Sequence, residues 1–213
     1  MYRLYYYPGN ANLAPHMMLE EIGAAYELVL VDRTAEAHKS PEYRRLNPMG
    51  RIPTLIDGDL VLNEAAAICL HLADRHPEAG LVPPVGSDAR ARLYNWLIFL
   101  TNTIQPEVLL YVYAARHTTD PSAVPSIRAK SAERLDAMFG ICETRLAGDG
   151  PWLLGGTFSA ADLYLLMMVR FARRTPEPPA TRYGALADHA ARVSARPAVV
   201  RAFESEGLER PWY

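Results

Sequence analysis

The stretch Asn47-Pro48-Met49-Gly50-Arg51-Ile52-Pro53-Thr54-Leu55 contains the features that decide the fold. A turn-forming cluster leads into Ile52-Pro53, and a β-favouring run follows at once. Proline is tolerated at the first residue of a strand but donates no hydrogen bond to a sheet, and an X-Pro bond in such a turn can be cis. We therefore expect the backbone of Ile52 to be free to pair with something outside the sheet.

A hairpin and a helix follow this stretch. Asp57-Gly58-Asp59 is a turn signal between the β-runs 54–56 and 60–62. The next helix is predicted over 64–76, and the free N–H groups of its first turn form a ready site for a carboxylate. A ligand that has both a peptide-like backbone and a carboxylate fits these two features.

The residues before this stretch alternate between strand and helix. Strands are predicted over 2–7 and 26–31, with a helix over 13–22 between them that Asn12 can cap and Gly23 can end. A strand, a helix and a strand in this order form a right-handed parallel unit. On the helix over 64–76 an apolar stripe at helical spacing predicts a core-facing side: Ala65, Ile68, Cys69, Leu72 and Ala73.

The residues after this stretch are predicted to be helical. Prolines and glycines over 77–86 indicate a linker. One long helix follows Ser87, with Leu93, Leu97, Leu100 and Ile104 on one face. Another begins at Pro125 and ends at Gly148, and the side chains expected to point inward are Ile127, Leu135, Met138, Cys142 and Leu146. We expect a small α/β domain over 1–78 and an all-α domain over 87–213.

The composition is that of an ordinary globular protein. The chain has 213 residues, of which 50% are hydrophobic and 22% charged, with a net charge of −2, which gives no electrostatic reason to expect nucleic acid as a partner. The most apolar run is interrupted by Pro106 and Glu107, so it indicates a buried helix rather than a membrane span. Met1 leads directly into a strand, so we expect a cytoplasmic protein without a secretion signal.

Several chemistry-bearing residues are best explained as structural. Cys69 and Cys142 lie on apolar stripes and form no Cys-x-x-Cys pair, so we expect core residues rather than nucleophiles. The six histidines show no ligand spacing, and no metal is expected. Ser159 and Asp162 have the spacing of a helix capping box.

The sequence resembles the cytosolic glutathione S-transferases of bacterial type over essentially its whole length. The segments that carry the resemblance are 5–9 with 13–16, 47–55, 63–65 with 67–68, 158–162, and 196–199 with 206–207. The resemblance implies a thioredoxin-like glutathione-binding domain, an all-helical domain that shapes the pocket for a hydrophobic electrophile, a homodimer and a role in detoxification.

The resemblance also assigns the residues that bind glutathione. Ile52 would pair its backbone with the cysteinyl part, next to a cis Pro53. Arg51, with Lys39 as a second contact, would hold the glycine carboxylate. Glu64 would bind the γ-glutamyl amine, and the Ala65 N–H would bind the γ-glutamyl carboxylate. The family usually has Ser or Thr where this chain has Ala65, so a hydrogen bond to that carboxylate is expected to be missing.

The group that activates the thiol is left open by the sequence. The thiolate is the nucleophile, and a free thiol has a pKa of about 8.5. A site can favour the thiolate with a hydrogen-bond donor and with the positive end of a helix. Beta-class relatives have a cysteine at the position of Ala11, which excludes a mixed disulfide through that residue. The donors that remain are the amides of Asn10 and Asn12 and the hydroxyls of Tyr5, Tyr6 and Tyr7. We favour an amide donor at Asn10 or Asn12, with Tyr6 in reserve.

The helical part offers candidates for binding the electrophile, and the overall function has alternatives. The residues at positions that line the family's electrophile pocket are Asn102, Gln105, Tyr111 and Tyr113. The leading hypothesis is a glutathione transferase. Glutathione-dependent peroxide or disulfide reduction is an enzymatic alternative, and a non-catalytic binding or interaction protein is an alternative of another class.

Overall fold

The computed structural model describes residues 1–213 and contains two compact units. Unit 1 comprises Met1–Val82 together with Ala195–Trp212, and unit 2 comprises Pro83–Ser194 together with Tyr213. The segment expected as one helical domain, 87–213, is therefore divided between them. The physical reason is that the last helix, α10 (Pro197–Ser205), packs along α1 (Leu13–Ile22) of unit 1.

Unit 1 is built on a four-stranded mixed sheet in the order β2-β1-β3-β4. The strands are β1 (Tyr2–Tyr6), β2 (Tyr26–Leu30), β3 (Thr54–Asp57) and β4 (Leu60–Leu62). β1 and β2 are parallel, whereas β3 pairs antiparallel with both β1 and β4. The predicted strand–helix–strand unit and the predicted hairpin are both confirmed.

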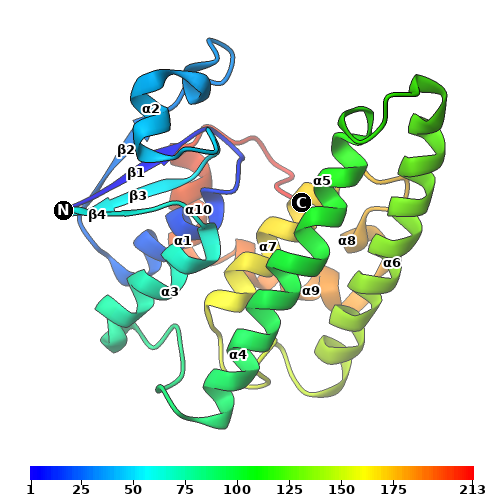
Figure 1. Ribbon diagram of the computed structural model, residues 1–213. Coiled ribbons are helices and arrows are strands. Elements are labelled where there is room, and N and C mark those ends of the chain that lie inside the picture. The colour runs from blue at the N-terminus through cyan, green and yellow to red at the C-terminus, as the bar shows by residue number, and fades with distance from the viewer. The chain divides into compact units, whose positions relative to one another are not determined.

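Helices cover both faces of this sheet (Figure 1). α1 and α3 (Ala65–Arg75) lie on one face and contact each other, and α2 (Pro41–Leu46) lies on the other. The stripe predicted on α3 is confirmed, because its five residues are all buried. Gly23 ends α1 in the left-handed conformation, as expected of a C-terminal glycine.

Unit 2 is helical. Its helices are α4 (Asp88–Phe99), α5 (Gln105–Val112), α6 (Val124–Gly148), α7 (Ala160–Ala172), α8 (Pro179–Arg182) and α9 (Gly184–Ser194). A π-helical segment, Leu100–Ile104, joins α4 to α5. Short 3₁₀ turns lie in unit 1 at Ala37–Lys39 and Pro77–Ala79. Two more lie in unit 2 at Ala114–Arg116 and Pro121–Ala123. The four residues predicted to share the buried face over 93–104 are each at most 1% exposed.

Two predictions for unit 2 have different outcomes. The capping box is confirmed: the Asp162 carboxylate accepts from the Ser159 backbone N–H at 2.8 Å, and α7 behind it is buried almost throughout. The prediction of which residues of α6 point inward was partly wrong. Phe139 is fully buried, whereas Met138 and Ile127 are only half-buried, because the stripe runs through Ser131, Leu135 and Phe139 at four-residue spacing.

None of the helices combines the length and the apolar character that a membrane crossing demands.

Candidate functional site

The loop before β3 is held in place by hydrogen bonds to the carbonyl of Arg51. The Tyr43 hydroxyl donates to this oxygen at 2.6 Å, and the Asn47 side-chain amide donates to it at 2.7 Å. The Ile52–Pro53 peptide bond is cis, as the sequence allowed. Two buried side chains from α2 and its C-terminal end therefore fix the backbone that precedes Ile52.

A second set of contacts ties this loop to the start of α3. The Thr54 hydroxyl donates to the Asn63 side-chain oxygen at 3.0 Å, and the Asn63 amide donates to the Leu46 carbonyl at 3.1 Å. Gly50 adopts φ +60°, and a Cβ there would lie 2.7 Å from the His38 carbonyl oxygen. Only glycine fits at that turn.

Polar groups at the loop and at the α3 N-terminus are left without partners in the chain. No hydrogen bond within the protein reaches the N–H or the carbonyl of Ile52. Ala65 is the first residue of α3, so its N–H is one of the donors that no helical carbonyl can satisfy. Glu64 is exposed and forms neither a cap hydrogen bond nor an ion pair. These groups are free to receive a ligand.

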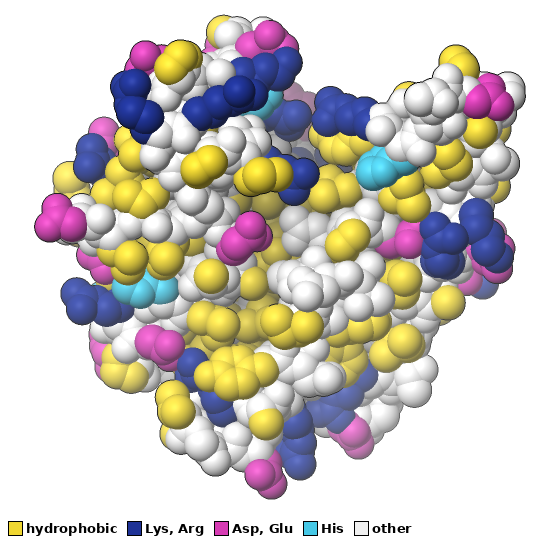
Figure 2. All heavy atoms as spheres, in the orientation of Figure 1, with side chains coloured by type: hydrophobic (Ala, Val, Ile, Leu, Met, Phe, Trp, Pro, Cys, Tyr) yellow, Lys and Arg dark blue, Asp and Glu magenta, His cyan; other side chains and the backbone are white.

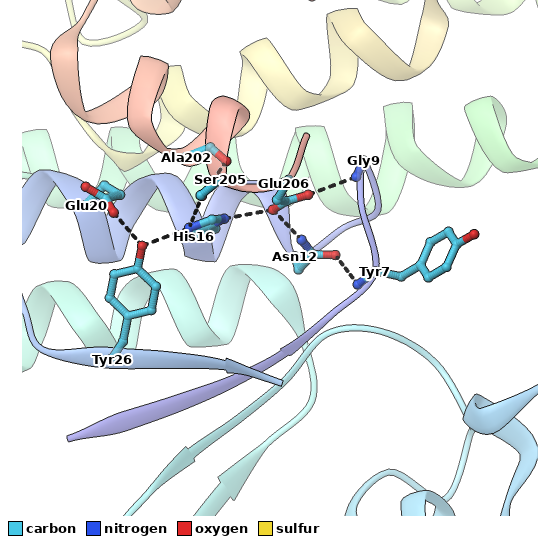
Figure 3. Close-up of polar contacts among 9 residues, drawn as sticks. All are labelled: Tyr7, Gly9, Asn12, His16, Glu20, Tyr26, Ala202, Ser205 and Glu206. Atoms are coloured by element: carbon cyan, nitrogen blue, oxygen red, sulfur yellow. Dashed lines mark hydrogen bonds and ion pairs between the residues drawn. The ribbon is translucent and has the colours of Figure 1, made fainter. Parts of the chain in front are cut away.

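The turn between β1 and α1 rests on a buried carboxylate from the C-terminal end of α10 (Figure 3). Glu206 accepts from the Gly9 backbone N–H at 2.8 Å, from the Asn12 amide at 2.7 Å and from His16 Nδ1 at 2.8 Å. His16 Nε2 contacts the Tyr26 hydroxyl at 2.9 Å, so the network reaches β2. The Glu206 and His16 side chains have no exposed surface, and the network therefore fixes the turn from inside the unit.

The side chain of Asn12 has a different structural role from the helix cap that the sequence predicted. It makes no side-chain cap hydrogen bond to α1, so the predicted capping contact was wrong. Instead, its side-chain oxygen accepts from the Tyr7 backbone N–H at 3.2 Å while its amide donates to Glu206. The side chain is wholly buried and braces the turn behind it.

Asn10 has the opposite environment. It is half-buried, and its side-chain oxygen accepts from Arg33 Nη1 at 3.0 Å. Its amide NH₂ group has no partner within the chain. Of the two asparagines proposed as thiol donors, only Asn10 has a free donor that is not buried.

The tyrosines of β1 are divided between the two faces of the sheet by strand alternation. The Tyr2 hydroxyl forms a hydrogen bond of 3.0 Å with His76 at the end of α3. Tyr2, and with it Leu4 and Tyr6, therefore lies on the face covered by α1 and α3. Tyr5 contacts Tyr43 of α2 on the other face. In Figure 3 the Tyr7 side chain points away from the Glu206 cluster.

Basic side chains gather over the segment that carries α2 (Figure 2). Lys39, a predicted ligand, is exposed and pairs with Glu36, and Arg51 is exposed without an ion pair. Burial, together with the charges of Arg33 and Lys39, lowers the pKa of His38 below its ordinary value. His38 is therefore neutral at pH 7, and the segment has a net positive field suited to a carboxylate.

The residues expected to bind the electrophile lie on the π-helical segment, on α5 and directly after it. Asn102 is exposed, and the Gln105 side-chain oxygen accepts from the Tyr164 hydroxyl at 2.7 Å. The Tyr111 hydroxyl donates to the Arg174 carbonyl at 3.1 Å, and the Arg116 guanidinium lies 4.2 Å from the Tyr113 ring centre. The Asn102 side-chain oxygen accepts from the Thr101 hydroxyl at 3.2 Å. All four residues thus have a partner within unit 2, and the two cavities described in that unit are lined by other residues.

The two cysteines are core residues. Both are fully buried, and burial raises the pKa of the Cys142 thiol to about 12 and that of Cys69 further. Neither thiol is ionised at neutral pH, so neither is a nucleophile in the folded protein.

Two residues whose side chains hold the turn after β1 were not identified as site residues from the sequence: Arg33 and Glu206. Arg33 comes after β2, and because the carboxyl ends of parallel neighbours meet at one edge of a sheet, its proximity to the turn after β1 could have been inferred. Glu206 lies in one of the segments that carry the family resemblance, but the sequence assigned it no role, since its contacts depend on how α10 packs.

With the geometry established, comparison with known proteins defines the class. Residues 1–74 match the family model "Glutathione S-transferase, N-terminal domain", and residues 125–192 match "Glutathione S-transferase, C-terminal domain". The chain is 30% identical to glutathione S-transferase GST-4.5 of Xanthomonas campestris, covering 81% of this chain and 83% of that protein. It is 29% identical to GstA of Escherichia coli O157:H7, covering 97% and 100%. The chain belongs to the glutathione S-transferase family.

Solved structures agree with this assignment. A glutathione S-transferase from Xylella fastidiosa has a TM-score of 0.90 at 30% identity, over 98% of this chain and 100% of that one. A Sulfitobacter homologue determined with bound glutathione has a TM-score of 0.88 at 28% identity, over 98% and 99%. The predicted fold, a thioredoxin-like unit followed by a helical unit, is confirmed.

Proposed function

We propose that this protein is a glutathione transferase that joins the thiolate of glutathione to a hydrophobic electrophile. The observation that carries the proposal is the set of unpartnered groups in unit 1: the backbone of Ile52 beside the cis proline, the first N–H of α3 at Ala65, and the exposed carboxylate of Glu64. A tripeptide with a free amine and two carboxylates supplies a partner for each.

Each part of glutathione has a counterpart of suitable chemistry. The cysteinyl N–H and C=O pair with Ile52, and the γ-glutamyl carboxylate binds the N–H of Ala65, where the helix dipole favours a negative charge. Glu64 binds the ammonium group. Arg51 binds the glycine carboxylate, and Lys39 contributes to the same positive field. The ion pair of Lys39 with Glu36 is exposed and contributes little stability, so Lys39 can exchange it for a ligand carboxylate.

The thiol is ionised by a neutral amide and a helix terminus. The free NH₂ group of Asn10 donates to the sulfur, and the N-terminal end of α1 adds its positive potential. Asn12 supports this geometry from behind and does not touch the sulfur. Tyr6 is the reserve donor. Once formed, the thiolate attacks the electrophile, to whose binding Asn102, Gln105, Tyr111 and Tyr113 contribute.

A second candidate is a binding protein without turnover. Ala65 favours it, because the missing hydroxyl removes a hydrogen bond to a charged group, which contributes about 1.5–3 kcal/mol. Reduction of peroxides or disulfides by the same bound thiolate is a third candidate, in which the protein's own buried cysteines take no part.

Glutathione-affinity capture followed by a conjugation assay with chloro-dinitrobenzene tests these candidates. Capture with turnover supports the transferase, and capture without turnover favours the binding protein. If the protein is neither captured nor active, the proposal is wrong. A parallel assay with cumene hydroperoxide identifies the reductase.

We also propose that the protein is a cytoplasmic homodimer. Apolar side chains are exposed on both units: Met49, Leu60 and Val61 on unit 1, and Tyr94 and Ile98 on unit 2. Such side chains mark an association surface when they are contiguous. Light scattering after gel filtration measures the mass, and a change of Ile98 to Glu is expected to give the monomer. A wild-type mass of one chain would contradict the proposal.

A further inference from the structure

The guanidinium of Arg33 has no acidic partner. Its single hydrogen bond within the chain runs from Nη1 to the Asn10 side-chain oxygen at 3.0 Å, and it lies 5.8 Å from the centre of the Tyr7 ring. The side chain is half-buried. Arginine has five N–H donors in a rigid fork. The single bond to a neutral amide therefore uses little of its hydrogen-bonding capacity and does not neutralise its charge.

The bond to Asn10 determines which way that amide faces. Arginine offers no acceptor, so the oxygen of Asn10 must face Arg33 and the NH₂ group must point the other way. The bond from Arg33 is the one hydrogen bond that the Asn10 side chain makes within the chain, so no other hydrogen bond fixes its orientation. Arg33 therefore decides whether a donor or an acceptor is presented to a ligand at this turn.

The surrounding charges leave the charge of Arg33 uncompensated. On its own loop, Asp32 accepts from the Thr34 hydroxyl and backbone, and Glu36 pairs with Lys39. His38, whose pKa is lowered by burial and by the charges of Arg33 and of Arg44 from α2, supplies no negative charge to Arg33. Beneath the turn after β1, the carboxylate of Glu206 already accepts three hydrogen bonds.

We propose that Arg33 is a positioning residue for the thiol: it fixes the Asn10 amide with its NH₂ group toward the glutathione sulfur. The inference rests on the proposed function, because it takes the sulfur to lie at Asn10. A donor held in place stabilises the thiolate more than a rotating amide that presents its oxygen part of the time. Arg33 thus acts through Asn10 and does not itself contact the sulfur.

The test is the pKa of the bound thiol, measured by the ultraviolet absorbance of the thiolate in the complex of the full-length protein with glutathione. Arg33→Met is expected to raise this pKa by about one unit, which reduces the thiolate fraction about tenfold below both values. Arg33→Lys retains a donor for the Asn10 oxygen and is expected to restore part of the shift. Arg45→Met, which removes an exposed arginine of α2, is the control and leaves the pKa unchanged.

A double-mutant cycle with Asn10→Ala separates the outcomes. If Arg33 acts through Asn10, Arg33→Met moves the thiol pKa by less than about 0.3 units when Asn10 is absent. An equal shift in both backgrounds, or no shift in the Arg33 variants while Asn10→Ala raises the pKa, overturns the positioning role and leaves the proposed function intact. A wild-type protein that fails to bind glutathione, or that leaves its thiol pKa at the free value, overturns the proposed function itself.

Discussion

The Glu206 carboxylate accepts a hydrogen bond from the Gly9 backbone N–H at 2.8 Å and so joins two residues that are 197 positions apart in the chain. The same carboxylate accepts from Asn12 and His16 in a fully buried environment. The geometry of the turn after β1, on which the proposed activation of the thiol depends, is therefore set by the end of the polypeptide.

Removal of this carboxylate should destabilise unit 1. Glu206→Ala removes the acceptor of three donors, two of which belong to the fully buried Asn12 and His16. We expect the free energy of unfolding to fall by about 3 kcal/mol, since breaking one side of a buried charged network has effects of this size. Urea denaturation measures it. Glu204→Ala, at an exposed position of the same helix, is the matched control, and equal effects of the two changes would show that Glu206 is not a structural anchor.

The two asparagines near α1 should differ in what they affect. Asn12→Ala removes a buried side chain that makes two hydrogen bonds, so it should lower the melting temperature by several degrees, as a loss of about 1–2 kcal/mol does. Asn10→Ala should leave the melting temperature unchanged and lower kcat/KM for conjugation about tenfold, as loss of a donor to a charged group does. Thermal melts and steady-state kinetics on both variants test this, and full activity in Asn10→Ala would exclude the amide as the thiol donor.

Restoring the hydroxyl at position 65 should strengthen glutathione binding. Ala65→Ser adds a hydrogen-bond donor at the first residue of α3, and we expect the dissociation constant to fall about tenfold, because a bond to a carboxylate contributes about 1.5–3 kcal/mol. Isothermal titration calorimetry provides the constant. Ala66→Ser, one residue further and half-buried, is the control, and an unchanged or weaker constant for Ala65→Ser would refute this role of the helix start.

Loss of the exposed carboxylate at the same site should have the opposite effect. Glu64→Gln keeps the size of the side chain but removes the charge that is proposed to bind the γ-glutamyl ammonium, so glutathione affinity should fall about tenfold or more. Glu64 has no ion pair in the chain, so the melting temperature without ligand should not change. A binding constant equal to that of the wild type would remove Glu64 from the site.

The cysteines should be unreactive in the folded state. Burial raises the pKa of Cys142 to about 12 and raises that of Cys69 as well, so at pH 8 the folded protein has almost no thiolate at either position. Iodoacetamide should modify neither residue until urea unfolds the chain, after which mass spectrometry should find both modified. Rapid modification of the native protein at either cysteine would contradict this assignment.

Most of the fold could be predicted because its elements follow local patterns. The stripe on α3, the hairpin turn at Asp57-Gly58-Asp59 and the capping box at Ser159 each depend on a few neighbouring residues. The glutathione-site candidates near Ile52 came from turn chemistry and from family resemblance. Features that depend on distant packing were missed. Asn12 has the residue type of a helix cap, yet a carboxylate 194 positions away holds its side chain instead, and Phe139 replaced Met138 in the core because the register of α6 is set by its neighbours.

The most direct test of the account is a crystal structure of the protein soaked in glutathione. The account predicts that the cysteinyl backbone of the tripeptide pairs with the N–H and carbonyl of Ile52, that its γ-glutamyl carboxylate lies at the N–H of Ala65, and that its sulfur is within hydrogen-bond distance of the Asn10 amide. Electron density that shows this groove empty at saturating glutathione, or filled by the protein's own side chains, would contradict it.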